Sequence, residues 1–122
     1  MLGAGGAALA DELGAPVKAL GWADRHAALS GVALLVNTTS QGMHGNPALD
    51  LDLIALPKTA LVSDVIYVPL ETPLIVAVNA RGNPTVGGLG MLLNQARPAF
   101  EAWFSVLPDI TPELRRMITA TL

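Results

Sequence analysis

The chain contains no cysteine, few aromatic residues and few charged ones. Without cysteine it forms neither disulfides nor thiolate metal sites, a composition that fits a reducing cytoplasm. Aromatic residues make up 4% of its 122 residues, so leucine, valine and alanine must fill the core. Charged residues make up 14%, the net charge is -3, and no basic run occurs, which argues against nucleic acid and anionic membranes as partners. His26 and His44 are isolated and lack metal-ligand spacing, so we expect surface or capping histidines and no metal site.

Long apolar runs are also missing. The uncharged interval 26–49 is interrupted by polar residues, so no membrane-spanning helix is expected. The first six residues lack the basic head and apolar centre of a signal peptide. Yet 52% of the chain is hydrophobic and the mean hydropathy is +0.50. This length and composition predict one small domain whose surface is partly apolar and meant for a partner or for a missing part of the same protein.

Apolar patterns and end signals predict an α/β fold, a small parallel sheet of four or five strands with helices on its faces. The strand candidates are Val17–Leu20, Val32–Val36, Ala60–Tyr67 and Pro84–Val86. The helix candidates are Ala7–Leu13, Ala23–Leu29, Pro73–Arg81, the segment after Gly90 and Thr111–Leu122. The continuous apolar run Val32–Val36 is typical of a parallel strand buried on both faces.

A glycine-rich segment, Gly3-Ala4-Gly5-Gly6-Ala7, opens the chain. It resembles the start of a dinucleotide loop, which needs glycines for the tight turn and for close approach of the backbone to pyrophosphate. Such a loop requires a preceding strand, and only Met1 and Leu2 precede it here. A truncated loop or a cloning remnant is therefore an alternative of equal weight.

Polar residues follow two of the predicted strands. Asn37-Thr38-Thr39-Ser40-Gln41 comes directly after Val32–Val36, where open α/β sheets bind ligands, although an ordinary polar loop would look the same. Asp64 interrupts the apolar run of the next strand candidate. A buried carboxylate is costly unless it is hydrogen-bonded, so we expect it at the strand end, bonded to nearby N–H groups. Tyr67 is expected to place its ring in the core and its hydroxyl in a cleft.

Three glycines at 87, 88 and 90 precede a helical pattern that runs to Trp103. This pattern predicts a glycine turn that opens a helix, whose free N–H groups could meet a polar ligand. Gln95 lies close to the apolar face of that helix and carries both a donor and an acceptor. Taken alone, the segment also fits a core helix with a tolerated glutamine.

Three of these segments occur together in the order found in one known family. They are Val36-Asn37-Thr38-Thr39-Ser40-Gln41-Gly42-Met43, Asp64-Val65-Ile66-Tyr67-Val68-Pro69 with Thr72-Pro73-Leu74, and Gly88-Leu89-Gly90-Met91-Leu92-Leu93-Asn94-Gln95-Ala96. Together they resemble the C-terminal NADP-binding half of the shikimate dehydrogenase family, over roughly residues 7 to 122. The resemblance implies a Rossmann-like sheet and reversible NADPH-dependent reduction of 3-dehydroshikimate to shikimate, a step of aromatic amino acid biosynthesis.

The resemblance also implies roles for individual residues. It assigns the cofactor to Gly3, Ala4, Gly5, Gly6 and Ala7 at the pyrophosphate, to Asn37 and Thr38 along the cleft, and to Val65, Gly88 and Met91 near the nicotinamide. It assigns the substrate, shikimate or 3-dehydroshikimate, to Tyr67 and Gln95. No residue inherits a catalytic role, because the family's catalytic Lys and Asp belong to a separate substrate domain, and Lys18 and Lys58 lack their context.

Departures from the family pattern set further expectations. The glycines run straight into Ala8–Gly14, so about one strand–helix pair, on the order of 30 residues, is expected to be missing, and with it the motif that selects NADP over NAD. The whole chain, 1–122, is then one truncated cofactor domain that is incomplete at its N-terminal edge. In the family, the helices that correspond to 89–122 pack on the substrate domain. Without that domain their apolar faces would be exposed, so we expect the chain to self-associate. A relative that acts on quinate and a non-catalytic α/β remnant that serves as a binding or assembly module stay open.

Overall fold

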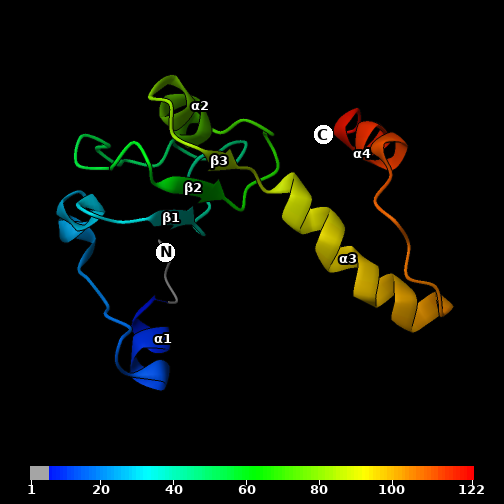
Figure 1. Cartoon of the computed structure of the whole chain (residues 1–122), viewed down its shortest axis with the longest axis horizontal. Helices are drawn as coiled ribbons and strands as arrows, with labels where there is room; N and C mark the ends of the chain where they lie inside the picture. Colours follow the sequence, from blue (N-terminus) through cyan, green and yellow to red (C-terminus); the bar gives the residue numbers. More distant parts are fainter. Residues whose placement is uncertain (1–5) are drawn as a thin grey trace.

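A parallel three-stranded sheet forms the centre of the protein in a computed structural model that describes residues 6–122 (Figure 1). Strands β1 (Leu34–Asn37), β2 (Leu61–Asp64) and β3 (Thr85–Val86) lie in the order β1-β2-β3. β1 and β2 are paired from Leu34 opposite Leu61 to Asn37 opposite Asp64, so their last residues meet at one edge. The predicted Rossmann-like parallel sheet with flanking helices is confirmed, although the part of the chain that the structure describes contains three strands rather than four or five.

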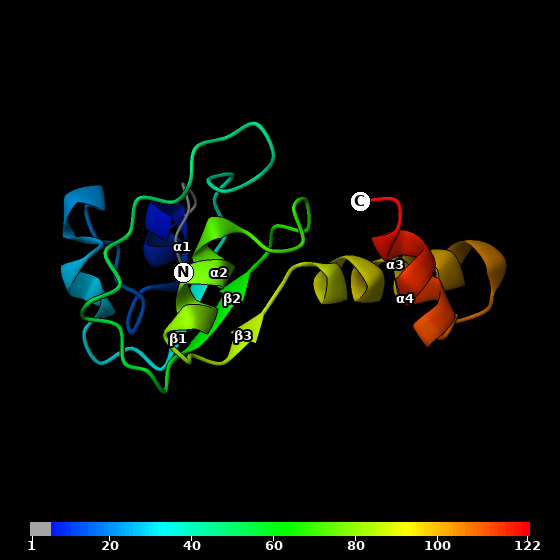
Figure 2. The same cartoon turned by 90° about the horizontal axis from the view of Figure 1, so that it is seen from above.

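Helices lie on opposite sides of this sheet, and two further helices extend from it (Figure 1). They are α1 (Gly6–Leu13), α2 (Pro73–Ala80), α3 (Leu89–Phe104) and α4 (Pro112–Thr119), with 3₁₀ turns at Trp22–Asp24 and Ala27–Leu29. α2 packs on β2 and β3, while α1 lies beyond β1 on the side away from α2 (Figure 1). α3 leaves the sheet after β3 and projects from it, and α4 returns alongside α3 (Figure 2). No helix within residues 6–122 is long and apolar enough to cross a membrane.

The hydrophobic core occupies one face of the sheet, under α2 and the loops around it. Its buried residues are Leu29, Leu35, Leu56, Ala60, Val62, Leu74 and Val78. Burial alternates along β1 and β2, so the residues between the core positions face outward. The prediction that Val32–Val36 is buried on both faces is wrong, because Leu34 is 51% exposed. β1 is an edge strand of the described sheet, and an edge strand has less cover than a central one.

Two of the predicted helices begin where their cap signals place them. The Thr72 hydroxyl accepts a hydrogen bond from the Ile75 N–H (3.3 Å) at the start of α2, and Pro73 occupies the first turn. The Thr111 hydroxyl accepts one from the Leu114 N–H (3.1 Å) at the start of α4, which also begins with a proline. These contacts satisfy N–H groups that a helix start otherwise leaves without a partner.

Two predictions in the N-terminal third fail. Val17–Leu20 is not a strand, and Leu20 is 53% exposed. A short apolar run becomes a strand only where a neighbouring strand can bond it, and no described strand lies beside it. The single helix expected at Ala23–Leu29 is instead the two 3₁₀ turns, separated by Arg25 and His26.

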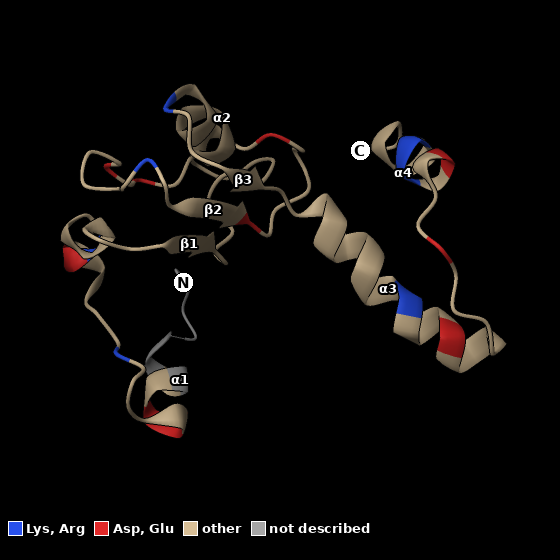
Figure 3. Cartoon of the chain, in the orientation of Figure 1, with Lys and Arg blue, Asp and Glu red and all other residues tan. Residues whose placement is uncertain are grey.

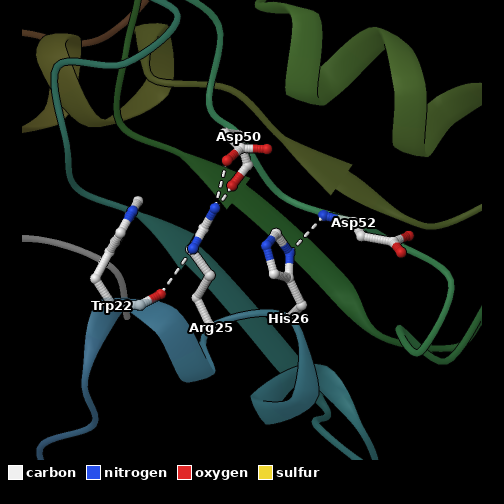
Figure 4. Close-up of polar contacts among 5 residues, drawn as sticks. All are labelled: Trp22, Arg25, His26, Asp50 and Asp52. Carbon is white, nitrogen blue, oxygen red and sulfur yellow. Dashed lines mark hydrogen bonds and ion pairs between the residues drawn. The ribbon is translucent and has the colours of Figure 1, made fainter.

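Polar contacts fix these turns to the loop before β2 (Figure 4). Arg25 donates to the carbonyl oxygens of Asp50 (2.7 Å) and Trp22 (2.9 Å) and forms an ion pair with the Asp50 carboxylate. Its guanidinium also lies 5.0 Å from the centre of the Trp22 ring. His26 accepts a hydrogen bond at Nδ1 from the Asp52 N–H (2.9 Å). The two turns are therefore held beside the core, to which Leu29 contributes.

Candidate functional site

Three loops leave the carboxyl ends of the strands and form one edge of the protein. They are residues 38–43 after β1, 65–70 after β2 and 87–88 after β3 (Figure 1). The Val65 N–H donates to the Asn37 carbonyl (3.2 Å) and the His44 N–H donates to the Val68 carbonyl (3.0 Å), so the first two loops are joined. In open parallel sheets ligands bind outside this edge, which makes it the candidate site.

The Asp64 carboxylate lies at the centre of this edge and is 1% exposed. It accepts hydrogen bonds from Asn37 Nδ2 (3.2 and 3.3 Å), from the Ile66 N–H (3.1 Å) and from the Thr72 hydroxyl (2.7 Å). The expectation that Asp64 ends the strand and is bonded to a nearby N–H is confirmed. These donors offset the desolvation of a buried carboxylate.

Asn37, the last residue of β1, uses its side chain inside the protein. Its exposure is 0%, its Nδ2 donates to Asp64 and to the Gln41 carbonyl (3.3 Å), and its Oδ1 accepts from the N–H (3.0 Å) and hydroxyl (2.8 Å) of Thr39. The Thr39 hydroxyl in turn accepts from the Gln41 N–H (3.1 Å). Asn37 therefore folds the following loop, while Thr38 beside it is exposed.

Gly88 is the residue that joins β3 and α3 to the middle loop. Its N–H donates to the Ile66 carbonyl (3.1 Å), and a Cβ built on it would lie 2.2 Å from the Val65 oxygen and 2.5 Å from the Ile66 oxygen. Only glycine permits this approach, since both neighbours are backbone atoms that cannot rotate away. The predicted glycine turn that opens a helix is confirmed, because α3 begins at the next residue.

Met91 and Gln95 lie on α3 beyond this turn, both with exposed side chains. Because they are four residues apart on a helix, they share a face about one turn apart. Val65 and Tyr67 are partly buried in the loop after β2. The structure therefore brings Asn37, Thr38, Val65, Tyr67 and Gly88 to one edge and continues from it to Met91 and Gln95.

The predicted phosphate segment is only partly visible. Gly3, Ala4 and Gly5 lie outside the described residues. Gly6 and Ala7 form the first turn of α1. A helix start is a suitable place for a phosphate, and the assignment of this segment to pyrophosphate stays a prediction.

Charge is scarce around the site. Residues 37–49 and 83–96 contain no Lys, Arg, Asp or Glu, and the first half of α3 carries no charged residue (Figure 3). A ligand at this edge would therefore meet hydroxyls, amides and backbone N–H groups.

Three polar residues near the site, Thr39, Gln41 and Thr72, were not among the site residues predicted from the sequence. Gln41 Oε1 is buried with no hydrogen-bond partner among residues 6–122, and the polar run after β1 was the signal that could have pointed to it.

A separate apolar pocket lies between α3, the segment that leads into α4, and α4 itself. It has a volume of about 290 Å³, and its walls include Leu93, Phe100, Leu114 and Ile118. The Arg97 Nε donates to the Pro108 carbonyl (2.7 Å) and closes the turn between the helices. The rings of Phe100 and Phe104 pack against each other with centres 4.5 Å apart.

The chain is similar in sequence to several curated proteins that carry the same name. No family model matches the chain. It is 55% identical over 112 residues to the shikimate dehydrogenase (NADP(+)) of Paramagnetospirillum magneticum and 57% identical over 116 residues to that of Methylobacterium radiotolerans. These matches cover 92% and 95% of this chain but 41% and 40% of the relatives. The chain thus spans about two fifths of the length of the curated relatives it matches.

Solved structures show the same fold. The chain superposes with a TM-score of 0.72 and 30% identity on shikimate 5-dehydrogenase from Thermus thermophilus in complex with NADP(H) and shikimate, covering 94% of this chain and 41% of that one. It superposes with a TM-score of 0.79 and 27% identity on quinate dehydrogenase from Corynebacterium glutamicum in complex with NAD, covering 96% and 41%.

Proposed function

Starting from the similarity of nearly the whole chain to the C-terminal NADP-binding half of shikimate dehydrogenases, we propose that it supplies the cofactor domain and part of the substrate cleft of such an enzyme. The reaction is the reversible NADPH-dependent reduction of 3-dehydroshikimate to shikimate. The observation that carries the proposal is the convergence of the three motif segments at the carboxyl edge of one parallel sheet.

The residues at this edge suit a dinucleotide. Thr38 and Met91 are exposed, Val65 is partly buried beside them, and Gly88 keeps the backbone of the neighbouring loop close. When bound, NADP supplies the hydride acceptor or donor. The chain's own part is to hold the nicotinamide side between Val65, Gly88 and Met91 and to place the ribose and phosphates along Thr38, in the loop that the buried Asn37 holds, and along the segment Gly3–Ala7.

The substrate would meet Tyr67 and Gln95, which provide a phenol hydroxyl and an amide for its hydroxyl groups. We assign to no residue of this chain the transfer of the proton from the reacting hydroxyl. The expected consequence is that the 122-residue chain binds cofactor but does not oxidise shikimate by itself.

The direct test is calorimetric titration of the chain with NADPH. Saturable binding is expected, and Met91→Glu should raise the Kd roughly fivefold, because it replaces an apolar contact to the nicotinamide by an exposed carboxylate that repels the phosphates of the ligand, which costs on the order of 1 kcal/mol. Ile54→Glu is the matched control, since Ile54 is exposed in the loop before β2, outside the candidate site and outside α3 and α4. An absence of binding up to millimolar NADPH, or equal effects of the two variants, would contradict the proposal.

Two alternatives need different tests. A quinate-type relative is kept open by the superposition on quinate dehydrogenase in complex with NAD. It predicts that the chain, once a substrate domain is supplied, oxidises quinate as well as or better than shikimate. A non-catalytic α/β module predicts that NADPH does not bind although the chain folds.

We also propose that the chain self-associates through α3 and α4. Trp103 is 79% exposed and Phe104 61% exposed, and the apolar pocket lies on the same pair of helices. Because one copy presents both protruding rings and an apolar pocket, a second copy of the chain is the proposed occupant. Light scattering should show a mass that rises with concentration, and Trp103→Glu should reduce it; a strictly monomeric profile would contradict this. We also propose a cytoplasmic location for the chain.

A further inference from the structure

We propose that Asp64 is a positioning residue that sets the relative geometry of the three loops at the candidate site. It would act on the cofactor through the backbone it holds, without contacting the cofactor itself. Its effect on binding rests on the proposed function, whereas its effect on the loops does not.

Asp64 is bonded to three segments around the site. Its carboxylate accepts from Asn37 at the end of β1, from the Ile66 N–H in the loop after β2 and from Thr72 at the start of α2. It reaches the loop after β3 only through Ile66, whose carbonyl accepts from Gly88. Each donor comes from a different segment, so loss of the carboxylate would release the segments from one another. A carboxylate with 1% exposure cannot exchange these donors for water without opening the edge.

The first link leads to the exposed residues of the β1 loop. Asn37 holds Asp64 with its amide nitrogen and holds Thr39 with its amide oxygen. The amide therefore orients the turn that contains Thr38. Replacing the Asp64 carboxylate by an amide places an N–H₂ group among donors, so the orientation of Asn37 is no longer specified.

The second link leads to Gly88 and α3. Asp64 accepts the Ile66 N–H, and the Ile66 carbonyl accepts the Gly88 N–H (3.1 Å). The same peptide segment presents the Val65 oxygen against Gly88. A shift of the loop after β2 therefore displaces the start of α3, where Met91 lies.

The third link, Thr72, allows a matched comparison within the chain. Thr72 and Thr111 both cap eight-residue helices that begin with proline, and both accept from the N–H three residues on. Thr72 also donates to Asp64 (2.7 Å), whereas the side-chain hydrogen bond of Thr111 is the one that caps its own helix. Replacing each by valine removes the same cap, but only Thr72→Val also removes a donor from Asp64.

The experiment compares Asp64→Asn, Thr72→Val, Thr72→Ser and Thr111→Val in the full chain. Amide hydrogen exchange is followed at Thr39, Ile66 and Gly88, together with urea unfolding and NADPH titration. In Asp64→Asn and Thr72→Val, exchange at these amides is expected to rise roughly tenfold or more, since one hydrogen bond to a charged group contributes on that scale. The Kd for NADPH should rise by a similar factor.

Thr72→Ser should restore wild-type exchange and affinity, because it keeps the hydroxyl. Thr111→Val should lower stability without changing the three amides or the Kd. Equal behaviour of Thr72→Val and Thr111→Val, or unchanged loop exchange in a folded Asp64→Asn, would overturn the proposal. If Asp64→Asn does not fold, the threonine variants still decide it. If the wild-type chain binds no NADPH, the proposed function fails while the exchange measurements still test the positioning role.

Discussion

Replacing Gly88 by alanine tests the packing on which the site depends. The added Cβ would lie 2.2 Å from the Val65 oxygen and 2.5 Å from the Ile66 oxygen, well inside contact distance. Both oxygens belong to the backbone, so relief requires a shift of the loop after β2 or of the start of α3. Such overpacking costs about 1–3 kcal/mol or more, and loss of the Gly88–Ile66 hydrogen bond adds about 1 kcal/mol. The expected destabilisation is therefore about 3 kcal/mol.

Gly90 provides the control within the same turn. A Cβ built on Gly90 meets no atom within 4 Å, and the residue is helical. Alanine there should leave stability unchanged or raise it by up to about 1 kcal/mol, because alanine is a better helix former than glycine. The two alanine substitutions, two residues apart, should thus have opposite signs.

Urea unfolding followed by circular dichroism measures both variants. With a urea dependence of about 1–3 kcal/mol per molar, the midpoint of Gly88→Ala should fall by roughly 1–3 M. A midpoint for Gly88→Ala that matches the wild type, or an equal loss in Gly90→Ala, would refute the reasoning. Because Gly88 is part of the packing, its substitution would not test ligand contact, and Met91 is the better position for that purpose.

Two further predictions concern stability away from the site. Leu56 is 2% exposed in the core and Ile54 is 83% exposed in the same loop, so Leu56→Ala should cost about 2–5 kcal/mol and Ile54→Ala less than about 0.5 kcal/mol in urea unfolding. The Asp50 carboxylate is 80% exposed, so Asp50→Asn should cost less than about 1 kcal/mol. Arg25→Ala should cost more than Asp50→Asn, because Arg25 also donates to two carbonyls; equal losses in thermal unfolding would show that those bonds contribute nothing.

The sequence predicted the elements whose ends are defined by local chemistry. Thr72-Pro73 and Thr111-Pro112 place a cap and a proline at adjacent positions, and both helices begin there in the structure. Such signals depend only on neighbouring residues, so they can be read without knowledge of the fold. The parallel strands β1 and β2 were likewise visible in the apolar runs Val32–Val36 and Ala60–Tyr67, although β2 ends at Asp64 and not at Tyr67.

Features that depend on distant neighbours could not be predicted in the same way. Val17–Leu20 has the apolar character of a strand but no described strand beside it, and the exposure of Leu34 follows from the position of β1 at the edge of the sheet. At the site, the sequence indicated that Asp64 needs donors but not which ones. Asn37 lies 27 residues away, and only the register of β1 and β2 brings the two together.

The site therefore consists of two sets of residues with different roles. Asn37, Asp64 and Gly88 are buried, and their polar groups are used within the protein. Thr38 and Met91 are exposed on the segments that the first set holds. Substitutions in the buried set should change stability and ligand affinity together, because they move the backbone, whereas substitution of the exposed Met91 should change affinity alone. With few charges near this edge, such a fixed backbone is the means by which it could bind a nucleotide, since N–H groups recognise phosphate only when they are held in place.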